Sequence, residues 1–268
     1  MTQQLSQTVS ALLLATCCIA GGEPIVFEVS NGPWERFRQP VSLAVAHELA
    51  VALEGQRLVE LDAGGAPGAE ALHALDMSTA DSAVLAWILP GITPPGETRR
   101  FAVVPPLATP SPPPTTDLTV TTTDEAIVVS NSYCAVSHPL KGNGGFPNQV
   151  VYQLSGHAEN RLKFLDRLYR RETGAQPSAA NDSEARAQVV FQSPVRVVIE
   201  SETGYGGGTS KAPGNIRATY RYVYTPYSPV VEVTAAITRD DTKLWDELHF
   251  LERRSVVGHR GRVRKPCV

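Results

Sequence analysis

Residues 216–224 read Ile-Arg-Ala-Thr-Tyr-Arg-Tyr-Val-Tyr, and this stretch decides the fold. In a β-strand, residues of equal parity share a face. One parity is apolar or aromatic: Ile216, Ala218, Tyr220, Tyr222 and Tyr224. The other parity carries Arg217, Thr219, Arg221 and Val223. Residues 230–238 follow after a short connection and alternate in the same way. The pattern predicts neighbouring antiparallel strands.

The β signal extends over most of the chain on either side. Further strands are predicted at 118–122, 126–130, 149–154, 162–169, 189–191, 195–200 and 245–252. Segment 162–169 also has leucines at helical spacing. Residues 195–200, 216–224, 230–238 and 245–252 are expected to be consecutive antiparallel strands. Segment 141–147 is a glycine-dense loop, and 176–186 is expected to be a polar surface loop.

The N-terminal part, 23–104, also has the spacing of strands and turns. Strands are predicted at 25–29, 41–45, 51–53, 84–89 and 101–104, with a turn at Asn31-Gly32-Pro33. Segment 69–77 is expected to be a short helix or an Ala-rich loop. A small β-sandwich or barrel fits this spacing.

A proline-rich stretch, 105–117, separates the two parts. It holds six prolines mixed with Thr and Ser, and proline cannot donate to a sheet ladder. We therefore expect a stiff linker between a β domain at 23–104 and a second β domain at 118–252. The predicted fold class is all-β.

The first 22 residues are typical of a signal peptide. The apolar run 11–20 is too short to span a bilayer and is followed by small residues, although residues 1–10 contain no Lys or Arg. Export to a secreted, periplasmic or cell-surface location is the favoured interpretation. Two alternatives stay open: a lipoprotein anchored at Cys17 or Cys18, and a buried N-terminal helix.

Composition excludes several partners. A net charge of −3 on 268 residues gives no field that would gather nucleic acid or an anionic membrane. After removal of a signal peptide only Cys134 and Cys267 remain, which is no disulfide framework, and no cysteine pair has metal-ligand spacing. No transmembrane span is expected and no metal site is predicted. The sequence does not identify a cofactor or an oligomeric state.

The C-terminal segment, 253–268, is irregular and basic. It contains six Lys or Arg residues, no acid and no period of 2 or 3.6. A tail that binds nucleic acid or an anionic glycan is one interpretation. A disordered end, or a shifted reading frame after a real strand, are the others, and the abrupt change at Arg253 favours the shifted frame.

The strands at 216–252 are predicted to have one dry face and one face of mixed aromatic, basic and acidic groups, which suits sugars. Aromatic rings stack on pyranose C–H faces, and charged side chains bond to hydroxyls or to a uronate carboxylate. For β-elimination, Arg217 or Arg221 would neutralise the carboxylate while Tyr220, Tyr222 or His249 moves the proton.

Hydrolysis would need two carboxylates, and Glu247 with Asp240 or Asp241 is the nearest combination. Trp245, with Tyr222, would supply an aromatic contact for the sugar. Asp240 and Asp241 could also offer oxygen ligands to Ca²⁺, although adjacent acids in a turn are more often solvated. The alternative is that the tyrosines belong to the core and the Arg–Glu pairs are cross-strand surface pairs.

The second domain resembles a known family. Residues 127–133 (Ile-Val-Val-Ser-Asn-Ser-Tyr), the loop 142–146, and segments 217–222 and 245–252 carry the likeness. They resemble the start of the galactose-mutarotase-like β-supersandwich of secreted bacterial polysaccharide lyases, above all the exo-rhamnogalacturonan lyase-like proteins. Residues 91–99 resemble the accessory β domain that precedes such sandwiches.

The resemblance covers 24–252 and implies a partial antiparallel supersandwich-like domain that acts on carbohydrate. Chains of this family are usually much longer, which agrees with truncation near Arg253, and no family catalytic residue maps onto this chain. We therefore expect an exported carbohydrate-active protein, and the leading hypothesis for its activity is a polysaccharide lyase or related protein acting on an acidic glycan. A non-catalytic carbohydrate-binding module and a structural cell-surface β protein are the alternatives.

Overall fold

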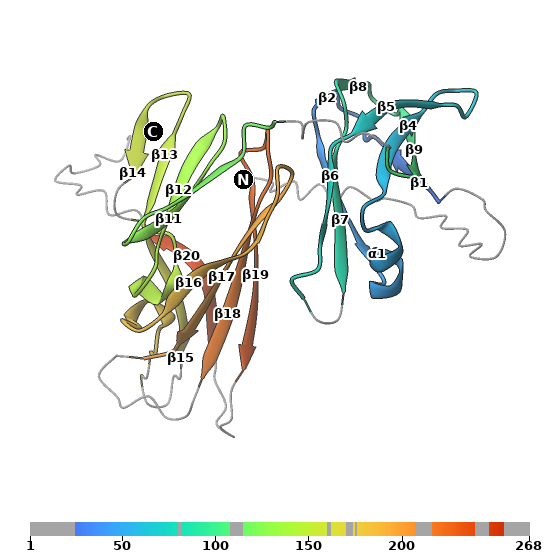
Figure 1. The fold of residues 1–268 in the computed structure, drawn as a ribbon. Helices are drawn as coiled ribbons and strands as arrows, with labels where there is room; N and C mark the ends of the chain where they lie inside the picture. The colour runs from blue at the N-terminus through green and yellow to red at the C-terminus, as the bar shows by residue number, and fades with distance from the viewer. Residues whose placement is uncertain are drawn as a thin grey trace. The chain divides into compact units, whose positions relative to one another are not determined.

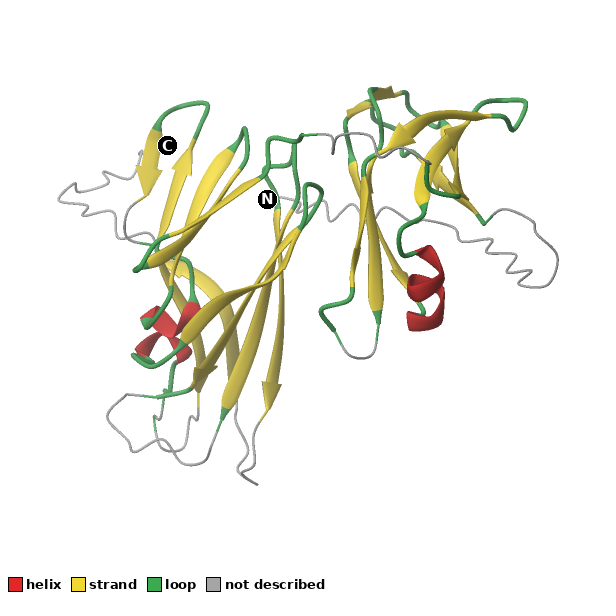
Figure 2. Cartoon of the chain, in the orientation of Figure 1, coloured by secondary structure: helices red, strands yellow, loops and turns green. Residues whose placement is uncertain are grey.

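Strands dominate the computed structural model of the chain, as Figure 2 shows. The structure describes residues 25–79, 82–107, 115–159, 162–169, 174, 176–206, 216–238 and 247–254. Strands account for 55% and helices for 7%, in several antiparallel sheets with no closed barrel among the described residues. The predicted all-β class is confirmed.

The elements follow one another as labelled in Figure 1. The N-terminal elements are β1 (Val26–Ser30), β2 (Arg36–Phe37), β3 (Pro40–Val45), α1 (His47–Leu53), β4 (Arg57–Leu61), β5 (Pro67–Ala71), β6 (His73–Asp76), β7 (Ala83–Ile88), β8 (Ile92–Thr93) and β9 (Thr98–Val104). The later elements are β10 (Thr119–Thr122), β11 (Ala126–Ser130), β12 (Cys134–Pro139), η1 (Asn143–Gly145), β13 (Gln149–Tyr152), β14 (His157–Glu159), β15 (Lys163–Tyr169), η2 (Ala179–Asn181), β16 (Arg186–Gln192), β17 (Val197–Gly204), β18 (Arg217–Tyr224), β19 (Val231–Thr238) and β20 (Glu247–Arg254).

The chain divides into two compact units. Unit 1 comprises Met1–Thr119 together with Val190–Val198 and Val223–Val231, and unit 2 comprises the remaining segments. Unit 1 is therefore built from three stretches of sequence, two of which lie far beyond the proline-rich segment.

Unit 1 buries its core between small sheets. Its sheets have the orders β1-β9-β4-β5, β3-β7-β6 and β2-β8. Trp87 on β7 is 1% exposed, and its ring centre lies 6.1 Å from that of Phe27 on β1 and 6.0 Å from that of Phe101 on β9. One large aromatic side chain thus joins the apolar faces of two sheets.

Two local predictions in unit 1 are wrong. Residues 51–53 end the helix α1, not a strand, because Ala50 and Leu53 lie three residues apart and are both buried on one helical face. Segment 69–77 forms parts of β5 and β6. Pairing with β4 and β7 overrides the helix preference of its alanines and leucines.

Unit 2 contains the five-stranded sheet β10-β11-β12-β13-β14 and the two-stranded sheet β15-β20. It also contains residues 186–189, 199–204, 217–222 and 232–238 of the sheet β16-β17-β18-β19. Side chains from these sheets meet in the interior: His138 on β12 contacts Tyr222 on β18 with ring centres 4.7 Å apart. Phe146 contacts Tyr220 with ring centres 5.0 Å apart.

The pairing of the last strands differs from the prediction. Strands β17, β18 and β19 are consecutive neighbours, as expected, and β19 ends the sheet order. Strand β20 pairs instead with β15, with Leu248 opposite Leu168. Residues 162–169 therefore form a strand despite their helical leucine spacing, because β20 supplies the ladder partner.

Candidate functional site

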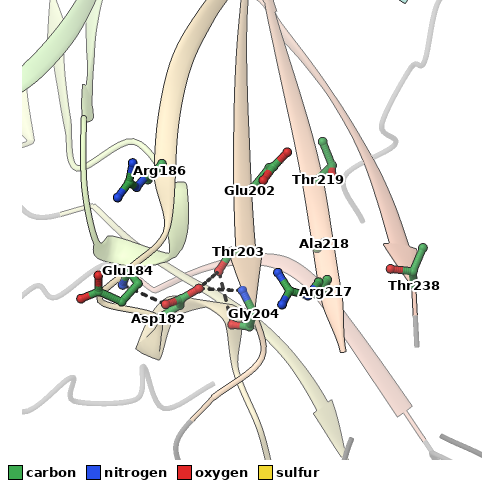
Figure 3. A pocket seen from close by; sticks show the side chains of 10 residues that line it. All are labelled: Asp182, Glu184, Arg186, Glu202, Thr203, Gly204, Arg217, Ala218, Thr219 and Thr238. Atoms are coloured by element: carbon green, nitrogen blue, oxygen red, sulfur yellow. Dashed lines mark hydrogen bonds between the residues drawn. The ribbon is translucent and has the colours of Figure 1, made fainter. Parts of the chain in front are cut away.

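A polar groove opens on unit 2. Its volume is about 420 Å³, and it is lined by Asp182, Glu184, Arg186, Glu202, Thr203, Gly204, Arg217, Ala218, Thr219 and Thr238. Figure 3 shows these side chains coming from the segment before β16 and from β16, β17, β18 and β19. The groove therefore lies over one face of the four-stranded sheet.

The strand alternation presents these groups to the groove. On β18, Ala218, Tyr220 and Tyr222 are buried while Arg217 is exposed and Arg221 half-buried. The polar residues of the 216–224 pattern thus share the outer face, and its aromatic residues share the inner one. The predicted alternation of this strand therefore holds from Arg217 to Tyr222, whereas Val223, on the parity of the arginines, is buried.

Asp182 fixes the rim of the groove. One carboxylate oxygen accepts hydrogen bonds from the Gly204 backbone N–H at 2.6 Å and from the Thr203 hydroxyl at 3.2 Å. The other accepts from the Glu184 backbone N–H at 2.9 Å. The first two bonds tie the segment before β16 to the end of β17, and the third holds the turn of that segment, so both carboxylate oxygens of Asp182 are engaged.

The glycine-dense loop at 141–147 is hydrogen-bonded to the segment that forms the rim of the groove. The Gly142 N–H donates to the Ala185 carbonyl at 2.7 Å, and the Gly144 N–H donates to the Asp182 carbonyl at 3.2 Å. Gly145 has a φ of 73°, and a Cβ there would lie 2.5 Å from Cβ of Ser201. Only glycine fits so close to β17, so the loop packs directly against the strand that lines the groove.

The charges around the groove are unevenly paired. Arg221 pairs with Glu200 at 2.9 Å, and Lys141 pairs with Glu184 at 2.9 Å. Arg186 and Arg217, by contrast, form no ion pair or side-chain hydrogen bond with any described residue. Two guanidinium groups at the groove thus keep their donors available for a ligand.

Beneath the sheet lies a buried polar cluster. The Asp166 carboxylate, 0% exposed, accepts hydrogen bonds of 2.6 Å from the hydroxyls of Tyr205 and Tyr220. Burial, followed by the hydrogen bond to Asp166, raises the pKa of each tyrosine far above its ordinary value. Burial also raises the pKa of Tyr222.

The residues predicted from sequence are not brought together. Arg217 lines the groove and Arg221 lies on the same strand face, paired with Glu200. Tyr220 and Tyr222 occupy the opposite, buried face, as the core alternative anticipated, so neither hydroxyl reaches the groove. This placement corrects their expected position beside the arginines.

The remaining predicted residues lie elsewhere or outside the description. Glu247 and His249 belong to β20, where they are register partners of Tyr169 and Arg167 on β15, in a different sheet. Trp245, Asp240 and Asp241 lie outside the described residues, as do segments 1–24 and 255–268.

Sequence reasoning missed most of the residues that line the groove. The sequence predicts a surface loop at 176–186, yet Ala179 and Ala185 within it are buried and Asp182 is the rim anchor. Glu202 falls beyond the predicted end of its strand, since β17 continues to Gly204. Glu202 lies two residues after Glu200, so a strand that continued past residue 200 would place both side chains on one face. This spacing could have indicated Glu202 from the sequence.

The described residues contain no cluster of three or more His, Cys, Asp or Glu residues arranged as a metal site. No helix within them has both the length and the apolar character to cross a bilayer.

Comparison with known proteins gives little further guidance. No protein-family model and no curated protein matches the chain. Among solved structures, an alpha-mannosidase from Enterococcus faecalis V583 is similar at 12% identity with a TM-score of 0.47. The match covers 79% of this chain and 30% of the mannosidase chain. At that identity and TM-score the likeness says nothing about substrate or reaction.

Proposed function

We propose that unit 2 binds an acidic glycan in the groove, with Arg186 and Arg217 as the groups that recognise a uronate carboxylate. The observation that carries this is the pair of guanidinium groups at the groove without a partner among the described residues, while Asp182 and Glu184 in the same lining are engaged by other residues. A guanidinium forms strong bidentate hydrogen bonds with a carboxylate.

The rest of the lining suits sugar hydroxyls. Thr219, Thr238 and Glu202 add hydroxyl and carboxylate groups that can donate to or accept from a polyhydroxylated ligand. The volume of about 420 Å³ is that of a site for a small ligand or one to a few sugar units. The expected aromatic stacking is not part of this groove, because Tyr220 and Tyr222 face inward.

Binding without cleavage is the activity that this geometry supports best. The described residues that line the groove include no His, Tyr, Cys or Lys, so the groups that could remove a proton are carboxylates, and two of these, Asp182 and Glu184, are engaged by other residues. Lyase activity is the alternative, because the sequence resembles that of polysaccharide lyases. We also propose that the protein is exported from the cell.

The test is isothermal titration calorimetry of the full chain with trigalacturonate and with its methyl ester as an uncharged control. Arg217→Ala is expected to weaken binding of the acid about tenfold to a hundredfold, because a charge-assisted bond is lost. Arg100→Ala, an exposed arginine on β9, is the matched control and should bind as the parent does.

Equal affinity of Arg217→Ala and the parent for trigalacturonate would refute the role of the groove. Incubation of the parent with polygalacturonate, followed by ultraviolet absorbance, tests the alternative. A rise from unsaturated ends would make the protein a lyase and not a binding module.

A further inference from the structure

An exposed apolar ribbon stands out on unit 1. Trp34 and Phe37 are each 61% exposed, and Ile92 is 58% exposed. Phe37 on β2 and Ile92 on β8 are direct register partners, so their side chains share one face of the two-stranded sheet. The other pair of this ribbon includes Thr93, which is buried. The outer face is therefore the apolar one.

Asn31 fastens Trp34 to the same ribbon. Its side-chain amide nitrogen donates to the backbone carbonyls of Trp34 at 2.9 Å, Thr93 at 2.9 Å and Pro94 at 2.7 Å. The Asn31 amide thus links the turn after β1 to the end of β8. The backbone that carries Trp34 is held beside the ribbon that carries Phe37 and Ile92.

Arg38 adds a cation at this position. Its guanidinium carbon lies 5.2 Å from the ring centre of Phe37 and 5.1 Å from that of Tyr227, which also belongs to unit 1. One guanidinium nitrogen donates to the Tyr227 hydroxyl at 3.2 Å. Arg38 is exposed and its other donors have no partner among the described residues.

The backbone here is strained. Arg38 has a φ of 46° and Tyr227 a φ of 57°, in the left-handed region that non-glycine residues rarely adopt. The Tyr227 N–H is held by the Asp117 carboxylate at 3.0 Å. Strain of this kind persists where the surroundings impose it, and it gathers at ligand sites.

We propose that Trp34, Phe37, Ile92 and Arg38, the aromatic platform, form a second saccharide site for an acidic sugar unit. Aromatic faces bind the C–H face of a pyranose, and the remaining donors of Arg38 bind its carboxylate. The ligand class rests on the function proposed for the groove, whereas the residues belong to unit 1 and not to the groove.

A single sugar fits this surface better than a protein partner does. The ribbon offers two residues on each strand. A stable protein interface buries about 800 Å² on each partner. One or two pyranose rings match a face of this size, with the guanidinium at its edge.

The experiment measures trigalacturonate binding by the full chain and its variants in isothermal titration calorimetry. Trp34→Ala and Phe37→Ala each remove an exposed ring, and the loss of stacking is expected to weaken one of two sites about tenfold. Arg38→Gly relieves the positive φ and removes the guanidinium, so it should fold and lose preference for the acid over its methyl ester. Leu154→Ala, at an 84% exposed leucine of unit 2, is the control.

The two proposals fail in different ways. If Phe37→Ala binds like the parent while Arg217→Ala loses one site, the aromatic platform is overturned and the groove stands. If Arg217→Ala binds like the parent while Phe37→Ala loses a site, the groove is overturned and the aromatic platform stands. A parent that self-associates in sedimentation, and a Phe37→Ala variant that does not, would identify an interface between copies and overturn the saccharide site.

Discussion

At the scale of single residues, the groove depends on glycines that contribute no side chain to it. Replacing Gly145 by alanine forces a Cβ to within 2.5 Å of Ser201 at a φ of 73°. We expect Gly145→Ala to lower the free energy of unfolding by about 2–5 kcal/mol, from backbone strain and overpacking together. Urea denaturation followed by circular dichroism measures the change.

Gly156→Ala is the matched control for this effect. Gly156 has a φ of 65°, but a Cβ added there would meet nothing within 4 Å, so only the backbone cost of about 1–2 kcal/mol applies. Equal losses for the two variants would show that the contact with Ser201 does not restrict the loop.

His138 makes stability depend on pH. Its side chain is fully buried, and burial lowers its pKa from 6.5 to about 3. Between these values the unfolded chain binds a proton that the folded chain excludes, so the stabilisation is complete above pH 6.5 and is lost as the pH falls toward 3. The free energy of unfolding should therefore fall by up to roughly 1.4 kcal/mol per pH unit in this window.

Urea denaturation at several pH values, with the parent and with His138→Gln, tests this assignment. The difference between the two profiles should be confined to the window from about pH 3 to 6.5. His157→Gln removes an exposed histidine and should leave the profile of the parent intact. Parallel profiles for the parent and His138→Gln would mean that another group controls the acid sensitivity.

At the scale of elements, strand β9 holds its sheet together through an arginine on its buried side. Arg99 is 7% exposed and makes a bidentate ion pair with Glu60 on β4. It also donates to the Pro90 carbonyl at 2.7 Å and the Thr93 hydroxyl at 3.0 Å. A lysine cannot reproduce this planar set of donors.

We expect Arg99→Lys to lower the free energy of unfolding by about 1–3 kcal/mol, because buried acceptors lose their partners. Its neighbour Arg100 points to the other face and pairs with Glu28, with both side chains nearly half exposed. Arg100→Lys should change stability by less than about 0.5 kcal/mol. Thermal denaturation of the two variants compares them directly, and similar losses would contradict the special role of Arg99.

Elements whose pattern is strong could be predicted from sequence, and those fixed by distant partners could not. The alternation at 216–224 correctly separated Arg217 from Tyr220, because a strand has a period of two whatever its neighbours are. The partner of β20 was unpredictable, since pairing with β15 joins segments roughly eighty to ninety residues apart in the sequence.

Of the charged residues that line the candidate site, only Arg217 could be predicted from the sequence. Arg217 was singled out correctly as a residue of the outer face, and it lines the groove. Asp182, Glu184 and Arg186 stand in a segment without period, so no local rule could bring them to the sheet. The hydrogen bonds from Thr203 and Gly204 to Asp182 bring them there, and these join residues more than twenty positions apart.

At the scale of the whole molecule, unit 1 is completed by late segments of the chain. Arg196 and Asp76, both in unit 1, are 8% and 3% exposed and form an ion pair at 2.9 Å. Val195, which precedes Arg196 in the sequence, packs with Ala86 and Ile88. Residues 120 positions apart in sequence therefore share one buried charge pair.

Asp76→Asn leaves the guanidinium of Arg196 buried without its counter-charge, and we expect a loss of about 3–5 kcal/mol. The double variant Asp76→Asn/Arg196→Met should lose less than the sum of the single variants, since it removes both charges. Glu70→Gln, which breaks an exposed pair with Arg57, is the control. Strictly additive losses in urea denaturation would show that the pair is not coupled.

Strand β19 has a consequence for handling the protein in concentrated solution. It spans eight residues and ends its sheet order, and residues 231–238 contain no Lys and no Pro. Natural edge strands commonly carry such residues, because open backbone donors and acceptors recruit other chains. Where this edge is open, it is the place at which aggregation would nucleate. Thr234 lies on the exposed side of β19 and lines neither proposed sugar site. Thr234→Lys is therefore expected to raise the solubility of the protein.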